Sequence, residues 1–298
     1  MQVFFSNVRR NTKLFFKDKG LFFTSLITPL ILLVLYATFL SNVYKSSFVQ
    51  VFSAMGSSVK QKALDGLVGG QLMSSLLAVS CVTVSFCSNM LMVQDKVSGA
   101  HNDLMITPLK RSTQALSYYV ATTISSLIVC YIALGACLIY VAVVGWYLSF
   151  VDILLLIADV FIMVTFGTAL SSVINYFLSS QGQISAVGSI VSSCYGFICG
   201  AYMPLASFSE GLRNAVMFLP GTYGTSLFRN HSIRGALEEI SKTAPEAIKG
   251  IKDSIDCNLY FFGSQVQTLT MYVVVIASIV VLITAYVLIN KFCKQKRK

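Results

Sequence analysis

Five long stretches of this 298-residue chain carry no charged residue. Each exceeds the roughly 20 residues that a helix needs to cross about 30 Å of hydrocarbon, and the fourth, with the apolar residues before it, suffices for two crossings. Only 11% of the residues are charged, far below the value of about 25% that is usual in soluble proteins. The chain is therefore predicted to be an all-α integral membrane protein with six transmembrane helices. The uncharged stretches are residues 20–44, 66–94, 112–151, 160–209 and 257–290.

The predicted organisation is an amphipathic helix over residues 1–20 followed by a six-span domain over residues 21–298. The hairpin between the fourth and fifth spans is uncharged, so its turn is inferred from polar residues and Gly182. The first apolar stretch is longer than the core of a cleaved signal peptide, which predicts a retained span. The six predicted spans cover residues 21–43, 67–93, 115–147, 153–177, 183–203 and 266–289.

The distribution of Lys and Arg predicts the orientation, because cytoplasmic loops and tails are enriched in both. The two tails hold ten of the 22 basic residues, whereas the first outer loop and residues 95–111 hold three each. An even number of spans places both termini on one side, so both are predicted to be cytoplasmic at the cell membrane. The net charge of +10 is then a consequence of topology, and no nucleic-acid partner is implied.

The sequence argues against an enzyme with its own active site. Both histidines, His101 and His231, are predicted in loops on opposite sides of the membrane, and Asp159 is alone among the ionisable residues in lying well inside a span. No Gly-Lys dipeptide occurs, so the chain has no phosphate-binding P-loop, and any ATP must be bound by another polypeptide.

The eight cysteines do not have the spacing of a metal or disulfide site. Only Cys257 is predicted to lie outside the membrane, and Cys293 lies in the inner tail. The others are interpreted as small apolar packing residues within spans, and no metal site is predicted: Cys81, Cys87, Cys130, Cys137, Cys194 and Cys199.

The first twenty residues form an amphipathic pattern when placed on a helix of 100° per residue. One third of the circumference carries the apolar set Phe4, Phe5, Val8, Thr12, Phe15 and Phe16. Beside and opposite it lie Arg9, Arg10, Lys13 and Lys17. Two interpretations remain open: an interfacial helix whose basic face meets anionic lipid or a partner, and a simple basic anchor for the first span.

The charged segment "DKVSGAHNDLMITPLKR", residues 95–111, separates the second and third spans. Asp95 is predicted to cap a helix N-terminus, Gly99 to permit a tight break, and Asn102 or Asp103 to cap a short helix that stops near Thr107-Pro108. A short helix exposing Leu104 and Met105 requires a groove on a partner. An ordinary connecting loop is the alternative.

This segment resembles the permease subunits of type-2 ATP-binding-cassette (ABC) exporters. Matching residues are Asp95, Lys96, Gly99, Leu104, Met105, Thr107, Pro108, Leu109 and Arg111, while Ala100 and Asn102 replace the family's Thr and Glu. The resemblance implies that residues 95–111 form a coupling helix seated in an ATPase subunit. It also implies a second contact through the N-terminal helix, with Arg9, Arg10, Lys13, Phe15 and Lys17.

A second match follows the fifth span. It comprises Gly200, Pro204, Leu212, Pro220, Thr222, Tyr223 and Arg229, although a second proline that the family has near residues 207–209 is missing. The resemblance implies short re-entrant helices that dip in from outside and cap the pathway, within an external segment over residues 204–265. Residues 230–257 are too few for an independent core and form a lid, a binding surface or a passive spacer.

Small residues recur every fourth position in the fifth span, at Gly188, Ser192, Gly196 and Gly200. Such a ridge allows close helix approach, either within the monomer or at a dimer interface, and the family pairs its first and fifth spans across a homodimer or pseudo-dimer. Asp159 either lines the pathway, is protonated, or is satisfied by a Ser, Thr or Tyr of a neighbouring span.

Together these features predict a multidrug-type permease that moves a drug, antibiotic, peptide or lipid-like molecule outward through a dimer-interface pathway. Its partners would be two ABC ATPase subunits, which bind ATP and Mg, a second permease copy or homologue, and the lipid bilayer. Alternatives are a polysaccharide or teichoic-acid permease, an ion-coupled secondary transporter, and a membrane scaffold or sensor. The secondary transporter would require paired intramembrane acids or inverted repeats, and neither is evident in the sequence.

Overall fold

The structure, a computed structural model, describes residues 2–54, 60–100 and 110–292. Within these residues the fold is helical except for one antiparallel hairpin, in which β1 (Leu259–Phe261) pairs with β2 (Ser264–Val266). A π-helix, Tyr36–Leu40, joins α2 to α3. The helices are α1 (Gln2–Lys17), α2 (Lys19–Leu35), α3 (Ser41–Ala54), α4 (Gln61–Val97), α6 (Arg111–Val144), α7 (Phe150–Tyr176), α8 (Gln181–Ile198), α9 (Glu210–Val216), α10 (Pro220–Ser232), α11 (Arg234–Ser241), α12 (Ala247–Ser254) and α13 (Thr268–Phe292).

Five helices of the described chain are long and apolar enough to cross a membrane. They match the first, second, third, fourth and sixth predicted spans. Helix α8 occupies the predicted fifth span but is not among the five, since its 18 residues include two glutamines and four serines. The protein is therefore an all-α multi-pass membrane protein. The five are Lys19–Gln50, Gln61–Val97, Arg111–Val144, Phe150–Tyr176 and Thr268–Phe292.

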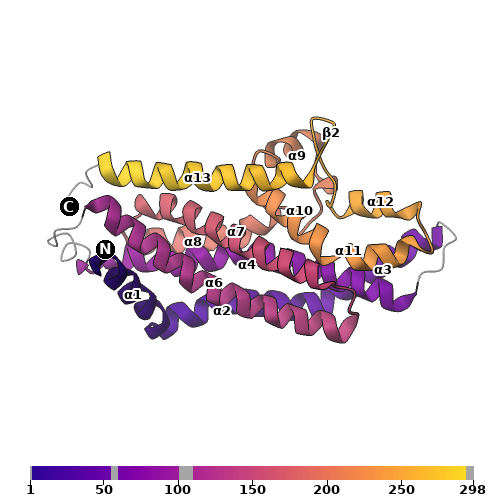
Figure 1. The fold of residues 1–298 in the computed structure, drawn as a ribbon, viewed down its shortest axis with the longest axis horizontal. Helices are drawn as coiled ribbons and strands as arrows, with labels where there is room; N and C mark the ends of the chain where they lie inside the picture. The colour runs from indigo at the N-terminus through magenta and orange to yellow at the C-terminus, as the bar shows by residue number, and fades with distance from the viewer. Residues whose placement is uncertain (1, 55–59, 101–109, 293–298) are drawn as a thin grey trace.

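Helix α4 lies at the centre of the bundle and packs against α2, α6, α7, α8 and α10 (Figure 1). Of its most apolar window, 89% is buried, whereas the corresponding share of α13 is 11%. Several polar side chains on α4 are hydrogen-bonded inside the protein. Asn89 Nδ2, for example, donates to the hydroxyls of Ser171 and Ser172 on α7 at 2.9 and 3.0 Å. A helix enclosed by other helices can carry such residues because neighbours, rather than lipid, provide the hydrogen bonds.

Helix boundaries follow local capping. Asp18 separates α1 from α2, and its carboxylate accepts a hydrogen bond from the Leu21 amide at 3.1 Å. At the start of α7, Ser149 and Asp152 form a capping box, in which each side chain bonds the other's backbone amide. Helix α4 ends just before Gly99, whose φ of +84° is the left-handed conformation common after helix C-termini.

The structure corrects one predicted boundary. Asp95 lies in the last turn of α4 and does not cap a helix N-terminus, because α4 continues to Val97 before the break at Gly99. The prediction failed because the charge-free stretch ends at residue 94, which suggested that the helix ended there too. A charged residue remains favourable in this helix because other helices supply its partners.

The two ends of the bundle differ in what covers them (Figure 1). Helix α1 and the C-terminal end of α13 lie at one end, with the end of α4 and the start of α6; we call this the inner end. Helices α11 and α12 lie at the other, which we call the outer end. Helix α11 packs against α12 and α4, and apolar residues in and beside the two short helices are buried, so this segment forms a folded cap; they include Ile233, Leu237, Ile240, Ile251 and Ile255.

Candidate functional site

At the inner end, three side chains from three helices form a cluster that we call the inner clamp: Arg10 of α1, Asp95 of α4 and Tyr118 of α6. Arg10 Nη1 lies 2.8 Å from Asp95 Oδ2, and the Tyr118 hydroxyl donates to the same oxygen at 2.5 Å. The hydrogen bond to Asp95 raises the pKa of Arg10. The Arg10 side chain is 33% exposed and that of Asp95 is 8% exposed. The clamp therefore joins α1 to both helices that flank residues 95–111.

Lys96, next to Asp95, binds the end of another helix. Its ammonium group donates to the carbonyl oxygens of Asn175, Tyr176 and Leu178 at 3.1, 2.8 and 3.4 Å. The last carbonyls of a helix lack intrahelical partners and carry the negative end of the helix dipole. Lys96 thus ties the end of α4 to the C-terminus of α7.

The remaining residues of the predicted coupling helix are placed only in part. Gly99 follows the end of α4, and Arg111 is the first residue of α6. Leu104, Met105, Thr107 and Pro108, together with Asn102, Asp103 and His101, lie outside the described residues. On the described flanks, the Tyr286 hydroxyl of α13 lies 3.4 Å from the Ala115 carbonyl oxygen on α6, so a further helix is fastened to this end.

Helix α1 is continuous and amphipathic, as its pattern predicts, but one residue of its basic face contacts the bundle. Val8, Asn11 and Phe15 are buried against the bundle, so Asn11 does not break the helix. Arg10, expected on the face toward lipid or a partner, turns inward to Asp95. The remaining basic residues of this helix, Arg9, Lys13 and Lys17, are exposed.

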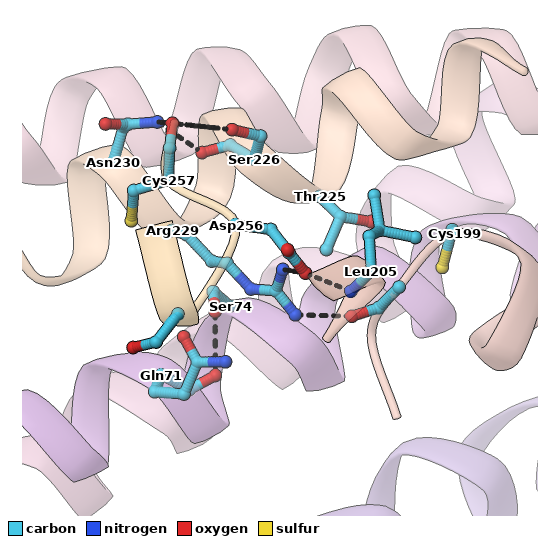
Figure 2. Close-up of polar contacts among 12 residues, drawn as sticks. Gln71, Ser74, Cys199, Leu205, Thr225, Ser226, Arg229, Asn230, Asp256 and Cys257 are labelled. Atoms are coloured by element: carbon cyan, nitrogen blue, oxygen red, sulfur yellow. Dashed lines mark hydrogen bonds and ion pairs between the residues drawn. The ribbon is translucent and has the colours of Figure 1, made fainter. Parts of the chain in front are cut away.

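At the outer end, a buried ion pair holds α10 to the residues that follow α12 (Figure 2). Arg229 Nη1 lies 3.0 Å from Asp256 Oδ2, and the two side chains are 1% and 6% exposed. Arg229 Nη2 also donates to the Gly200 carbonyl oxygen, and Asp256 accepts from the Leu205 amide at 2.8 Å. Burial raises the pKa of the Asp256 carboxyl in spite of the nearby guanidinium. We call this group the outer ion pair.

Further hydrogen bonds from α10 surround the outer ion pair. The Cys257 carbonyl oxygen accepts from the Ser226 hydroxyl at 3.1 Å and from Asn230 Nδ2 at 2.8 Å (Figure 2). Cys257, predicted to lie outside the membrane, is buried within the protein. The described part of the chain contains no group of three or more potential metal ligands.

The other residues of the second motif connect α9 to α10. Pro220 is the first residue of α10, where a missing backbone N–H has no cost. The Thr222 and Tyr223 hydroxyls donate to the carbonyl oxygens of Val216 and Met217 at 3.0 and 2.7 Å. Pro204 precedes a short 3₁₀ turn at Leu205–Ser207. Helix α10 packs against α4, α7 and α13 and is buried over most of its length.

A third polar cluster lies inside the bundle around Asp159 of α7. Its carboxylate oxygens contact His231 Nδ1 at 2.5 Å and the Tyr272 hydroxyl at 2.7 Å. Of the alternatives open for Asp159, satisfaction by a tyrosine of a neighbouring span is therefore observed. His231 belongs to α10 and is buried, so its predicted location in a loop is wrong. The prediction failed because α10 returns into the bundle after the fifth predicted span.

The small residues of α8 contact other parts of the same chain. A Cβ atom at Gly188 would lie 2.8 Å from Met90, and one at Gly196 would overlap the ring of Tyr202. Gly200 has a φ of +73° and is bonded to Arg229 through its carbonyl oxygen. Ser192 is half-buried, while the opposite face of α8 exposes Ile190 and Phe197.

Several of these residues were not expected from the sequence. The partners Asp256 for Arg229 and His231 for Asp159 come from segments far along the chain, and sequence spacing does not indicate such pairs. One indication existed for Arg229: it is a cation preceded by 15 uncharged residues, 214–228, so a buried counter-charge had to be sought. The partners of Lys96 carried no indication, since they are backbone carbonyls.

The model of the ABC-2 type transporter family matches residues 2–231, which include α1, the inner clamp and all but the last residue of α10. The chain belongs to the ABC-2 type transporter family. As a member, it is the transmembrane permease component of an ABC transporter, which pairs with ATP-binding-cassette subunits. Helices α11 to α13 and the hairpin lie beyond the match. A search among curated proteins found no match.

Proposed function

We propose that this ABC-2 permease exports an amphipathic or lipophilic molecule, driven by ATPase subunits that engage residues 95–111. The inner clamp is the observation that supports this proposal. It fastens α4 and α6, which flank that segment, to α1, while Lys96 fastens α4 to α7. Force applied between α4 and α6 would thus move several helices together.

The proposed assembly contains two ATPase subunits and a second permease copy or homologue, with ATP and Mg bound by the ATPases alone. The absence of a Gly-Lys dipeptide supports this division of labour. The exposed basic residues Arg9, Lys13 and Lys17 of α1 provide a second contact for the ATPase or for anionic lipid. The coupling contacts themselves are assigned to Leu104, Met105, Thr107 and Pro108.

In the proposed topology the inner end is cytoplasmic, and α8 together with the residues after it completes a sixth crossing. The shared location of α1 and the C-terminal end of α13 supports an even number of crossings (Figure 1). The pathway would run along α2, α4 and α8 at the interface of two permeases. The apolar surfaces of α2 and α8 exposed in the single chain support this placement; they include Phe23, Ile27, Val34, Ile190 and Phe197.

Two alternatives concern the cargo and the energy source. A polysaccharide or teichoic-acid permease has the same architecture, and the folded outer cap argues mildly against it. An ion-coupled secondary transporter is favoured by one observation, the buried contact between Asp159 and His231. Export that persists without ATP but collapses with the proton gradient would support the second alternative and contradict the proposal.

The test is co-purification with the ATPase encoded nearest to this chain, followed by vanadate-sensitive ATPase activity in lipid nanodiscs. Leu104→Asp should abolish assembly or turnover because a carboxylate would be buried in the ATPase groove. Unchanged assembly and turnover would remove the coupling role of residues 95–111.

A charge exchange tests the inner clamp directly. Arg10→Glu and Asp95→Arg should each lower stimulated turnover at least about threefold, because like charges then face each other, and the double variant should recover most of the loss. Lys19→Glu is the matched control, since Lys19 is an exposed basic residue at the start of α2 to which no contact is assigned. Equal effects of Arg10→Glu and Lys19→Glu would contradict a role for the clamp.

A further inference from the structure

Polar side chains at the junction of α2, α4 and α10 are buried with incomplete hydrogen bonding. Gln71 of α4 is 0% exposed, and neither its Oε1 nor its Nε2 atom has a hydrogen-bond partner among the described residues. The same holds for Arg229 Nε of α10 and for the hydroxyl of Tyr36, where α2 passes into the π-helix. Buried amides are nearly always bonded, so this arrangement requires an explanation.

The three groups lie on elements that pack against one another, since α4 contacts both α10 and the π-helix that holds Tyr36. Figure 2 places Gln71 beside the Arg229 side chain, with Ser74 one turn further along α4. Tyr36 is near enough to Arg229, Tyr202 and Cys199 for electrostatic interaction. Helices α2 and α4 belong to the proposed pathway, and α10 lies in the segment that the family resemblance implies caps it.

The charges at this junction restrict what can bind. The positive charge of Arg229 is already matched by Asp256, and its Nη atoms are engaged by Asp256 and Gly200. An added anion would leave an excess negative charge in a buried place, which is unfavourable. The groups that remain are one N–H of Arg229, an amide with a donor and an acceptor, and a hydroxyl. They complement an uncharged group that both donates and accepts hydrogen bonds.

The surroundings of Tyr36 are apolar. It borders a small void of about 10 Å³ between α2, α4 and α6, whose other lining residues are Leu33, Ala37, Leu72, Met73, Leu76, Cys137 and Tyr140. The void is too small for a cargo molecule. Cargo can reach Gln71 only when α2 or α10 moves away from α4, and an apolar chain would then lie along the void while its polar group meets Gln71.

We propose that Gln71, Arg229 Nε and the Tyr36 hydroxyl form a cargo-contact site for an uncharged amide or hydroxyl group of an amphipathic molecule. This inference rests on the proposed function and names its substrate class. Gln71 makes the specific contact, because its side-chain amide has no other partner among the described residues. Arg229 also holds the outer ion pair, so Gln71 is the better position for a test.

The experiment uses the complex of this chain with its ATPase in lipid nanodiscs and measures stimulated ATP hydrolysis. The probes are 2-benzyltetradecanamide, the corresponding methyl ester and the corresponding free acid. They share the alkyl chain and the ring, contain no other amide, and differ in the terminal group. In the wild-type complex, the amide should reach half-maximal stimulation at a concentration about tenfold lower than the other two.

The variants are Gln71→Leu and Gln71→Met, with Gln114→Leu as the matched control. Gln114 on α6 is also a buried glutamine with an unbonded Nε2 atom, and it lies near the inner end. Either Gln71 variant should raise the half-maximal concentration of the amide about tenfold and leave that of the ester unchanged. Gln114→Leu should keep the preference for the amide.

Four results would overturn the inference: equal responses to the three probes, no response to any of them, the strongest response to the acid, or an unchanged preference in both Gln71 variants. If a Gln71 variant keeps the preference for the amide probe and melts at a higher temperature than the wild type, Gln71 binds only an ordered water. These results differ from failure of the proposed function, in which the complex does not form or its ATPase activity is independent of this chain.

Discussion

The inner clamp and the outer ion pair both join an arginine to an aspartate, but the two pairs differ in their exposure to solvent. Arg10 reaches Asp95 from a surface helix and stays partly in contact with water. Arg229 and Asp256 are enclosed, and backbone groups complete their hydrogen bonds. A partly exposed pair can separate and re-form at modest cost, whereas separation of an enclosed pair leaves a buried charge. The inner end is therefore suited to movement and the outer end to a fixed shape.

The largest effect is expected from breaking the outer ion pair. Asp256→Leu should lower the free energy of unfolding by about 3–5 kcal/mol, because Arg229 would keep its charge without a partner. Arg229→Met should cost less, since Asp256 can take up a proton. Thermal and denaturant unfolding of the purified protein in detergent measures both. The double variant Arg229→Met/Asp256→Leu should be more stable than Asp256→Leu, and equal stability of all variants and wild type would contradict the comparison.

The same pair predicts a dependence on pH. Burial already raises the pKa of Asp256, and Arg229→Met removes the cation that opposes this rise. A carboxyl whose pKa is raised in the folded state favours folding as the pH falls. As the pH falls from 8 to 5, the melting temperature of Arg229→Met should therefore approach that of the wild type. A constant or growing difference would show that Asp256 does not titrate as described.

The second largest effect concerns the seating of the outer cap. A Cβ atom at Gly235 of α11 would lie 1.8 Å from the Tyr147 carbonyl oxygen, so Gly235→Ala should destabilise the protein by about 1–3 kcal/mol. Gly250→Ala on α12 is the matched control, as nothing lies within 4 Å of its Cβ position. It should be neutral or stabilising by up to about 1 kcal/mol. Equal melting temperatures of the two variants would contradict a docked cap.

A smaller effect is expected at the inner clamp. Arg10→Gln should cost about 1 kcal/mol or less, because the guanidinium is partly exposed and its attraction to Asp95 is screened. The difference between Arg10→Gln and wild type should shrink between 0.05 and 1 M salt, while the defect of Asp256→Leu should not. Arg9→Gln controls for loss of charge on α1. If the stability loss of Arg10→Gln does not change with salt, the inner clamp behaves as a buried ion pair, like the outer ion pair, and the comparison fails.

The smallest effect is expected at the surface of the outer cap. Glu239 contacts Lys242 and Lys60 at 2.6 and 2.9 Å, and these lysines lower its pKa to about 2. A lowered carboxyl pKa contributes stability that is lost only as the pH falls toward that value, so no change is expected between pH 8 and pH 5. Lys60→Gln should leave the melting temperature unchanged, because the pair is exposed. A measurable loss would show that this contact holds the cap.

Much of the fold was predictable because the local amino-acid composition indicates where membrane spans lie. The spans predicted from the charge-free stretches located five helices to within several residues, and the amphipathic pattern predicted α1. Helix α10 was harder, since a helix buried in protein needs no long apolar run, and its Ser, Thr and Gly residues resemble a loop. The family motif around Pro220 and Tyr223 drew attention to it, but not to the burial of His231.

The contacts of the candidate site were predictable only in part. Asp95 and Lys96 were assigned to the coupling segment and Arg10 to the N-terminal contact, yet their partners depend on which helices meet in space. Asp256 and Gln71 were missed for the same reason: one is an ordinary acid in a polar segment, and the other is one glutamine in an apolar stretch. Pairing across the bundle is a tertiary property, and local patterns do not contain it.

The length of α4 has a consequence for both ends. Its 37 residues extend about 55 Å at 1.5 Å per residue, well beyond the hydrocarbon of a bilayer, and no proline or π-helix interrupts it. Asp95 and Gln71 therefore sit on one uninterrupted rod. A tilt of a few degrees that begins at Asp95 also displaces Gln71, because no break in the helix lies between them to absorb the movement. The two ends of the protein therefore move together.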